Sequence, residues 1–346
     1  IKIIIIIFFI CLIIINYFSK NEIEEFQERK YYNYNFDVDA VITWVDSKDS
    51  NWITEYNKYN KYNKYNNKEI KLRNASNIRF ESIGELYYCL KGITIYLPWI
   101  NTIYLVVMRP QKPKYINEFP KVKIVYHDEI YKNKHKKYLP IFNSMSIETQ
   151  LHNIPNLKEH FLYFNDDSFI GKPLKKDMFF TNNGEIKFYN RHFQNGYVKD
   201  TNNIINNKYR INLKKTAPQH QVFSLRKSYF KQLWGKFPVE LENTSKSKFR
   251  KKNNIWMMNL IYQLCHTKIL NDSKCNYIDL NEKEIIYTCM TNKNYANDTK
   301  KILKSLHEYT PSFICITNID STNPEHIKFW NLFTEYYKNN LLKYYI

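Results

Sequence analysis

A chain of 346 residues is long enough to bury a sizeable core, in one large domain or two modest ones. Hydrophobic residues make up 44% and charged residues 25%, which excludes an intrinsically disordered chain. The net charge of +19 comes from scattered lysines, without zinc-finger spacing or an RNP-like motif, so we expect no nucleic-acid partner. The charge fits a solvated lysine-rich surface, or one that steers polyanionic substrates.

An apolar run opens the chain. Residues 3–18 carry no charged side chain, and Lys2 and Lys20 flank them. The run is slightly shorter than the roughly 20 residues of a spanning helix, and no small-residue cleavage site follows it. We therefore expect a signal anchor over residues 1–19 and a stem over 20–35, in a single-pass type II membrane protein of the secretory pathway.

Strands alternate with helices over residues 36–346, which we expect to form one domain. Residues 38–45 predict a strand, and the Tyr-Asn-Lys tract over 56–67 predicts a low-complexity loop. A helix is expected over 82–96, strands over 103–108 and 122–126, a helix over 144–154, and a strand over 161–164. This alternation predicts an α/β fold, with a mainly parallel sheet flanked by helices and ligands at the carboxyl ends of the strands.

The last part of the chain is less regular. Residues 182–211 are polar and Asn-rich, and we expect an insertion there. Residues 214–268 are helix-like, and a strand and a helix are expected after Tyr309. The six cysteines show no metal-site spacing. A lumenal domain would be compatible with one or two disulfides among the last four: Cys265, Cys275, Cys289 and Cys315.

Acidic residues follow two of the expected strands. Asp46 follows the first, and Asn165-Asp166-Asp167 follow the apolar segment 161–164. Carboxylate and amide oxygens are hard ligands that suit Mg²⁺ or Mn²⁺ held by a diphosphate. An Asx turn or a helix cap would use the same residue types. We predict a metal site on Asp166 and Asp167.

Three blocks of sequence carry a resemblance to a known family. The first is residues 36–46, ending in Thr43-Trp44-Val45-Asp46. The second contains Glu85-Leu86, residues 97–100 and 139–144, Ile147-Glu148, residues 151–154 and 164–167. The third contains His220, Phe237-Pro238, Thr244 and Phe249-Arg250. In order and spacing these blocks resemble the Stealth family of sugar-1-phosphate transferases, over roughly residues 36–265.

The resemblance implies a reaction and a setting. The family includes the GlcNAc-1-phosphotransferase that begins the mannose 6-phosphate tag, and bacterial capsule polymerases. It implies transfer of a hexose or N-acetylhexosamine 1-phosphate from a UDP-sugar to a sugar hydroxyl of a glycan or polysaccharide, with release of UMP. It also implies a Rossmann-type, nucleotide-sugar transferase-like version of the α/β fold, and we expect a Golgi location.

The resemblance also assigns roles to residues. It implies a catalytic set in which His220 is the general base, Arg250 binds phosphate oxygens, Asp167 holds the Mg²⁺ or Mn²⁺ ion with Asp166, and Glu148 orients hydroxyl groups. The donor-binding set that it implies is Thr43, Trp44, Asp46, Asn143, Ser144 and Asn165. Trp44 fits both stacking on the donor and packing in the core. Arg79 and Lys91 fit both phosphate contacts and surface charges.

Three departures from the family pattern leave alternatives open. Ser47 stands where the family often has Gly, and Glu81-Ser82 replace an Arg-Asp pair. The fourth block would be residues 315–318, Cys-Ile-Thr-Asn, which lack the usual acid although Asp320 lies close by. A conventional metal-dependent glycosyltransferase and a non-catalytic sugar-binding relative are therefore the alternatives to a sugar-1-phosphate transferase.

Overall fold

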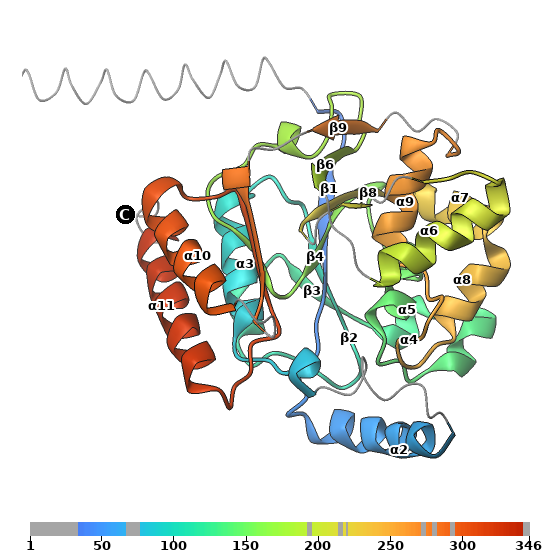
Figure 1. The fold of residues 1–346 in the computed structure, drawn as a ribbon, viewed down its shortest axis with the longest axis horizontal. Helices are drawn as coiled ribbons and strands as arrows, with labels where there is room; N and C mark the ends of the chain where they lie inside the picture. Colours follow the sequence, from blue (N-terminus) through green and yellow to red (C-terminus); the bar gives the residue numbers. More distant parts are fainter. Residues whose placement is uncertain are drawn as a thin grey trace, which may run out of the picture.

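A five-stranded sheet runs through the molecule (Figure 1), in a computed structural model that describes residues 34–66, 77–191, 196–213, 217–218, 221–270, 275–278, 282–290 and 295–341. The strand order is β3-β2-β1-β4-β8. The strands are β1 (Val38–Thr43), β2 (Ile103–Val107), β3 (Val122–Tyr126), β4 (His160–Asn165) and β8 (Phe223–Arg226). The first four are parallel, and β8 is antiparallel to β4. The predicted α/β fold with a mainly parallel sheet is confirmed.

Helices cover both faces of this sheet, so its central strands are buried and mostly apolar. In β1, the four residues Val38, Ala40, Val41 and Ile42 are fully buried. One side holds α3 (Glu85–Tyr96), α10 (Tyr295–Tyr309) and α11 (Pro324–Leu341); the other holds α5 (Ser144–Glu148), α6 (Gly196–Tyr209), α7 (Lys227–Lys236), α8 (Pro238–Ser245) and α9 (Met257–His266) (Figure 1).

Short helices complete the connections. The α-helix among them is α4 (His127–Ile130), which follows β3. The 3₁₀ helices are η2 (Asn77–Phe80), η3 (Ile116–Glu118), η4 (Asn133–Tyr138), η5 (Leu151–Asn153), η6 (Lys176–Met178) and η7 (Glu282–Glu284). The expected helix over 144–154 is therefore divided into α5 and η5, since the regular helix ends at Glu148.

Two smaller sheets join distant parts of the chain. One has the order β10-β11-β5, and consists of β5 (Ser168–Ile170), β10 (Ile285–Cys289) and β11 (Phe313–Thr317). The other has the order β7-β6-β9, and consists of β6 (Lys187–Arg191), β7 (Ala217–Pro218) and β9 (Asn276–Ile278). A disulfide joins Cys265 of α9 to Cys275, just before β9.

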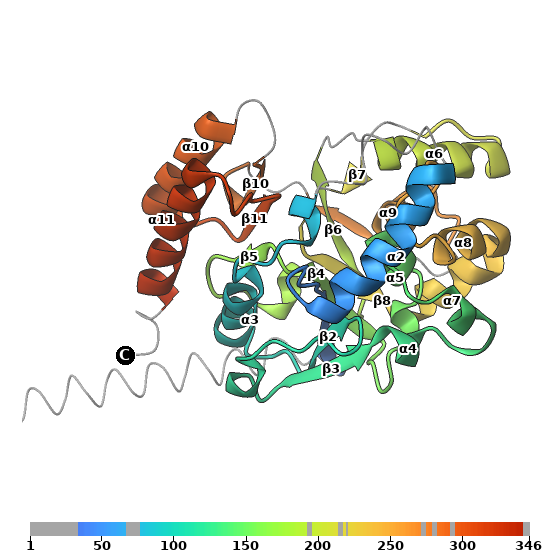
Figure 2. The ribbon, with the colours of Figure 1, turned by 90° about the horizontal axis from the view of Figure 1, so that it is seen from below.

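Helix α2 (Ser50–Asn66) corrects the loop predicted over 56–67. Trp52 and Tyr56 are spaced four residues apart, which places their rings on one face of a helix. Both are buried, with Met108, Phe142 and Phe249, in an apolar cluster separate from the main core. Figure 2 shows α2 crossing in front of the ends of the strands. Aromatic spacing therefore outweighs the low complexity of the tract.

The described part of the expected insertion over 182–211 is also structured. It contains β6 and α6. On α6, Val198, Thr201, Asn202 and Ile205 are buried, at spacings of three, one and three residues that form one face of a helix. The prediction relied on the Asn-rich composition and did not use the helical spacing of these four residues.

No helix in the described part of the chain is long and apolar enough to cross a membrane. Residues 1–19, the expected anchor, and most of the expected stem lie outside the described residues.

Candidate functional site

The candidate site lies where β1 and β4 end. From β1 the chain continues to β2 and β3 on one side, then crosses to β4 on the other side of β1. Ligands of open α/β sheets bind at such a switch in strand order, beyond the carboxyl ends of the strands. Thr43 and Asn165 are partners in the register of β1 and β4. Two residues predicted to bind the donor thus lie side by side at this switch point.

A buried tyrosine links these strand ends to α5. The hydroxyl of Tyr163 lies 3.0 Å from Thr43 Oγ1, 3.3 Å from Glu148 Oε1 and 3.3 Å from Asn165 Oδ1. Tyr163 is 1% exposed and Glu148 is 4% exposed. Burial raises the pKa of Glu148 to about 8, although the positive charge of Arg250 and the Tyr163 hydrogen bond oppose the rise. The Tyr163 hydroxyl therefore links three predicted site residues, Thr43, Glu148 and Asn165, and the charge of a fourth, Arg250, acts on Glu148.

Carboxylates gather next to this network. Asp166 and Asp167 are half-buried. Desolvation, and then the negative charge of Glu85, raise the pKa of Asp166 well above its usual range and that of Asp167 to about 7. Burial, with a smaller contribution from Asp46, raises the pKa of Glu85 to about 7. Like charges crowd together here, which favours either protonation or a bound cation.

The donor set of this cluster fits Mg²⁺ or Mn²⁺. Aspartate oxygens are hard ligands, and magnesium is usually bound through one or two carboxylates plus substrate phosphates and water. Among the described residues, no group of three or more His, Cys, Asp or Glu side chains is arranged to hold a metal by itself. Asp166 and Asp167 would accordingly hold the ion together with a phosphate-bearing substrate.

The guanidinium of Arg250 lies beside the acidic cluster, and that of Arg79 lies near Arg250. Arg250 Nη2 donates a 2.7 Å hydrogen bond to Ser144 Oγ, and the charge of Arg250 lowers the pKa of both Glu148 and Asp167. Burial lowers the pKa of Arg79, and the positive charge of Arg250 lowers it further. The guanidinium of Arg250 lies 5.7 Å from the ring centre of Tyr197. Neighbouring cations of this kind are suited to an oxyanion such as a diphosphate.

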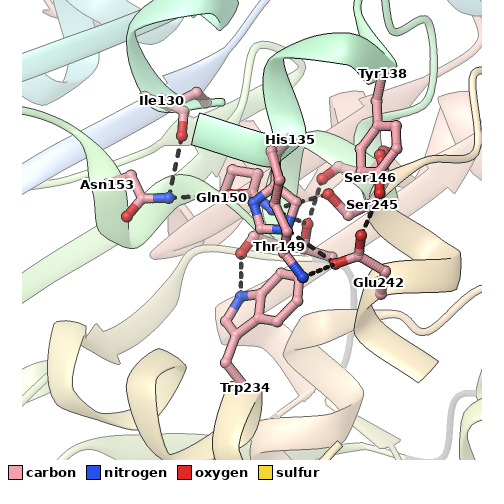
Figure 3. Close-up of polar contacts among 11 residues, drawn as sticks. Ile130, His135, Tyr138, Ser146, Thr149, Gln150, Asn153, Trp234, Glu242 and Ser245 are labelled. Atoms are coloured by element: carbon pink, nitrogen blue, oxygen red, sulfur yellow. Dashed lines mark hydrogen bonds and ion pairs between the residues drawn. The ribbon is translucent and has the colours of Figure 1, made fainter. Parts of the chain in front are cut away.

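Helix α5, which carries Glu148, is fixed by polar contacts to its neighbours (Figure 3). Ser146 Oγ donates to the carbonyl of Ser245 and lies 2.9 Å from the Tyr131 hydroxyl. Just beyond the helix, Gln150 Nε2 donates to Ser245 Oγ at 2.8 Å, and Trp234 Nε1 donates to the Thr149 carbonyl at 3.0 Å. These contacts hold Glu148 in place before any ligand binds.

A second set of contacts in Figure 3 ties η4 to α8. Glu242 accepts a hydrogen bond from the Tyr138 hydroxyl, and its Oε2 lies 2.9 Å from His135 Nε2 and 3.3 Å from Lys134 Nζ. Lys248 Nζ donates to the carbonyls of Tyr138 and Pro140 at 2.7 and 3.0 Å. The segment that leads to Ser144 is therefore anchored to the segment that leads to Arg250.

The structure gives Asn143 a different role from the predicted contact with the donor. Asn143 is fully buried, and its Nδ2 donates to the Ser247 carbonyl at 3.1 Å and to Asn254 Oδ1 at 3.0 Å. Its Oδ1 accepts from the amide of Met145 and so caps α5. With both ends of the amide used internally, Asn143 positions Ser144 rather than facing a ligand.

The other four predicted residues have four different outcomes. Trp44 is in the core and donates to Ser82 Oγ at 3.3 Å, so the structure favours core packing over stacking. Asp46 is half-buried and its Oδ1 accepts from the amide of Lys48, as in an Asx turn. Lys91 lies 3.8 Å from Glu118, on the flank of α3, and is a surface charge. His220 lies outside the described residues.

The sequence prediction missed Tyr163. Tyr163 and Asn165 are two residues apart on β4, so their side chains project from the same face of the sheet. That period could have identified Tyr163, but the strand was interpreted only as an apolar run. Tyr197 gave no comparable signal, because only the fold brings α6 towards Arg250.

Comparisons with known proteins now identify the family. Residues 79–188 match conserved region 2 of Stealth proteins, and residues 219–265 match conserved region 3. The chain is 32% identical over 328 residues to the capsular polysaccharide phosphotransferase fcs1 of Haemophilus influenzae, across 88% of this chain and 84% of that protein. The chain belongs to the Stealth family. A second capsular polysaccharide phosphotransferase, LcbA of Neisseria meningitidis, is 33% identical over 283 residues, across 76% of this Stealth chain and 75% of LcbA.

Likeness to solved structures is remote. Mouse xyloside xylosyltransferase 1 aligns with a TM-score of 0.42 and 9% identity, over 83% of this Stealth chain and 99% of that one. The galactosyltransferase LgtC aligns with a TM-score of 0.40 and 9% identity, over 86% and 95%.

These relatives correct the predicted localisation. Both phosphotransferases are bacterial capsule enzymes and not Golgi proteins. No described helix of this Stealth protein is long and apolar enough to cross a membrane. The predicted location in the Golgi of a secretory pathway is therefore wrong. The single-pass type II anchor was predicted over residues 1–19, which lie outside the described residues.

Proposed function

We propose that this Stealth protein is a phosphotransferase that moves a hexose or N-acetylhexosamine 1-phosphate from a UDP-sugar to a hydroxyl of a glycan or polysaccharide, releasing UMP. One observation carries the proposal. Asp166 and Asp167, at the end of β4, lie close to Arg250, whose charge acts on both Asp167 and Glu148. Residues 36–346 would form the single catalytic domain. The names of the fcs1 and LcbA relatives support phosphoryl transfer in polysaccharide synthesis.

Each residue type matches a need of phosphoryl transfer, which depends on positioning and on neutralising the oxygens of the transferred group. Asp166 and Asp167 would hold Mg²⁺ or Mn²⁺, which supplies positive charge to the diphosphate. Arg250, oriented by Ser144, would bind phosphate oxygens through its planar fork. Thr43 and Asn165 end the strands at the switch point, where they would contact the donor.

In the proposed reaction one P–O bond forms and one breaks, and a single base takes the proton of the acceptor hydroxyl. The acceptor hydroxyl oxygen forms a bond to the β-phosphorus, and the bond from that phosphorus to the oxygen bridging the two phosphates breaks. UMP leaves with that oxygen, and the anomeric C–O bond of the sugar is kept. His220 would take the hydroxyl proton, and ionised Glu148 would accept a hydrogen bond from a substrate hydroxyl.

A non-catalytic sugar-binding relative is the second candidate, favoured by one observation. Cys315 Sγ lies 3.7 Å from Asp167 Oδ1, so the fourth block reaches the carboxylate cluster although it has lost its acid. A missing acid at this place would weaken metal or donor binding.

The test follows which nucleotide is released. The chain is incubated with Mg²⁺ or Mn²⁺, a panel of UDP-sugars and simple sugar acceptors. UMP that forms only with metal and acceptor is the expected result. UDP would indicate a conventional glycosyltransferase, and donor binding without either nucleotide would indicate the non-catalytic relative.

The matched variants are Asp167→Asn and Asp177→Asn. Asp167→Asn should reduce UMP release by at least about 100-fold, because it removes a charged ligand from the phosphate site. Asp177 belongs to η6, outside the carboxylate cluster, and its variant should retain the wild-type rate. Equal rates for the two variants would refute the metal-binding assignment.

A further inference from the structure

We propose that Tyr163 is a positioning residue for this reaction, whose buried hydroxyl ties Glu148 to Thr43 and Asn165 at the ends of β1 and β4. The inference rests on the proposed function, and adds to it a residue that none of the sequence motifs assigned. The contacts that carry it are the three distances from the Tyr163 hydroxyl, 3.0 Å to Thr43 Oγ1 and 3.3 Å to both Glu148 Oε1 and Asn165 Oδ1.

A phenol has one proton, and three partners compete for this hydroxyl group. The hydroxyls of Thr43 and Tyr163 can each donate to the other, and Thr43 is the donor whenever the Tyr163 proton goes to another partner. The Tyr163 proton then goes either to Glu148 or to Asn165, which are both acceptors at these atoms. An ionised Glu148 is the stronger acceptor, since hydrogen bonds to a charged group are about twice as strong as neutral ones. The charge of Glu148 therefore determines which way the hydroxyl points.

Because both side chains are buried, the partner that receives the Tyr163 proton has a large effect on the charge of Glu148. Tyr163 and Glu148 are almost completely buried, and the backbone of Met257 also hydrogen-bonds the Glu148 carboxyl. A buried carboxylate depends on its few partners, because water cannot replace them. The charged or titratable groups that act on Glu148 are Arg250 and Tyr163, and Asp166 acts in turn on Tyr163. Of these, only Tyr163 is bonded to both strand ends.

A consequence follows for catalysis. Ionised Glu148 is the stronger acceptor for a substrate hydroxyl, and the Tyr163 hydrogen bond favours its ionised form. Removal of the phenolic hydroxyl should raise the pH at which Glu148 ionises by about one unit, as expected for one hydrogen bond to a carboxylate. At pH 7, where Glu148 is mostly protonated, kcat/KM should fall about tenfold.

The experiment uses Tyr163→Phe, which deletes only the hydroxyl, and reads out Glu148 in two ways. The first readout is the infrared carboxyl band of Glu148 as a function of pH, identified by its loss in Glu148→Gln. The second is the pH profile of kcat/KM. We expect both to shift upward in Tyr163→Phe, and we expect no pH shift when Tyr163→Phe is added to Glu148→Gln.

Controls separate positioning from general stability. Tyr104→Phe alters another buried tyrosine of the same sheet, on β2, and should leave both curves unchanged. Thr43→Val removes the donor to the Tyr163 oxygen, and serves as a second variant if Tyr163→Phe fails to fold; it should shift the infrared titration in the same direction by less. A lower melting temperature with an unshifted titration would overturn the proposal.

The infrared titration also keeps this inference distinct from the proposed function. It requires neither donor nor acceptor, so it can succeed in a protein that releases no UMP. UMP release with an unmoved Glu148 titration would refute the role of Tyr163 alone.

Discussion

Arg250 carries the positive charge that acts on both Glu148 and Asp167. Burial raises the pKa of each carboxyl, and the guanidinium opposes that rise in both. Ser144 holds the guanidinium through a 2.7 Å hydrogen bond, next to Tyr197. Arg250 thus has two functions that can be separated. Its positive charge alone would lower the pKa of the two carboxyl groups, whereas its planar guanidinium would also bind phosphate oxygens.

Substitutions at Arg250 should separate these two functions. Arg250→Ala should lower the rate of UMP release about 100-fold or more, as for loss of one group that stabilises developing charge. Arg250→Lys keeps the charge but not the fork, so its rate should lie between those of the wild type and Arg250→Ala. The measurement is kcat and KM for the UDP-sugar in both variants.

The matched control for this series is Arg226→Lys. Arg226 donates to Glu159 Oε1 at 3.1 Å and pairs with His160, at the start of β4 and so at the opposite end from the site. Its rate should be that of the wild type. If Arg250→Lys were as active as the wild type, Arg250 would act as a charge only, and the fork would have no part in phosphate binding.

At the scale of elements, the site depends on contacts between α5, α8 and η4. Glu242 of α8 is the shared acceptor for Tyr138, His135 and Lys134 (Figure 3). Burial alone would raise the pKa of Glu242, but these three hydrogen bonds outweigh it and lower the pKa to about 2. Glu242 therefore stabilises the fold in its ionised form, and its contribution depends on pH.

Glu242→Gln should lower the free energy of unfolding at pH 7 by about 1–2 kcal/mol, the range for hydrogen bonds to a charged group that is partly exposed. A group whose pKa is depressed on folding contributes above its unfolded value, about 4.3 for Glu. The difference between wild type and variant should therefore be full above pH ~4.5 and disappear towards pH 2. Urea unfolding at a series of pH values measures it.

Glu240→Gln provides the control on the same helix. Glu240 pairs with Lys208 at 3.7 Å, and surface pairs contribute less than about 1 kcal/mol. Glu240→Gln should therefore change the free energy of unfolding only slightly. A difference for Glu242→Gln that stays constant from pH 7 to pH 2 would show that the ionised carboxylate does not hold η4 in place.

Elements were predictable from the sequence where one physical signal dominated. The strand at 103–107 and the acidic end of β4 could be predicted, because a strand buried on both faces is a continuous apolar run. The edge strand at 122–126 could be predicted from its β-branched residues, although Lys123 is exposed. Helix α2 could not, since its repeated Tyr-Asn-Lys composition obscured the spacing of Trp52 and Tyr56. The pairing of Ser144 with Arg250 could not either, because it joins residues 106 positions apart.

At the scale of the whole molecule, β11 connects the C-terminal part of the chain to the carboxylates. Strand β5 starts immediately after Asp167 and pairs antiparallel with β11. The amide of Ile316 donates to the Asp167 carbonyl at 3.1 Å, and Cys315 Sγ contacts its carboxylate. The sequence predicted a strand and a helix after Tyr309, but not that this strand would fix the backbone of a proposed metal ligand.

The chain around β5 and the chain around β11 approach each other closely at Gly171. Its amide donates to the Ser312 carbonyl at 3.1 Å, and a Cβ on Gly171 would lie 2.1 Å from the Pro311 carbonyl oxygen. Backbone cannot rotate away as a side chain can, so Gly171→Ala should push β11 from β5. We expect a loss of about 1–3 kcal/mol of unfolding free energy, as for other overpacked positions, together with reduced UMP release because Asp167 moves.

Gly235→Ala is the matched substitution, because a Cβ on this residue of α7 would meet no atom within 4 Å. It should be neutral or stabilising by up to about 1 kcal/mol, since alanine is the better helix former. Thermal unfolding and UMP release would be measured for both variants. If Gly171→Ala loses stability but keeps full activity, β11 supports the fold without positioning Asp167. If Gly171→Ala loses activity at temperatures well below its unfolding transition, the pairing of β11 with β5 positions Asp167 for catalysis.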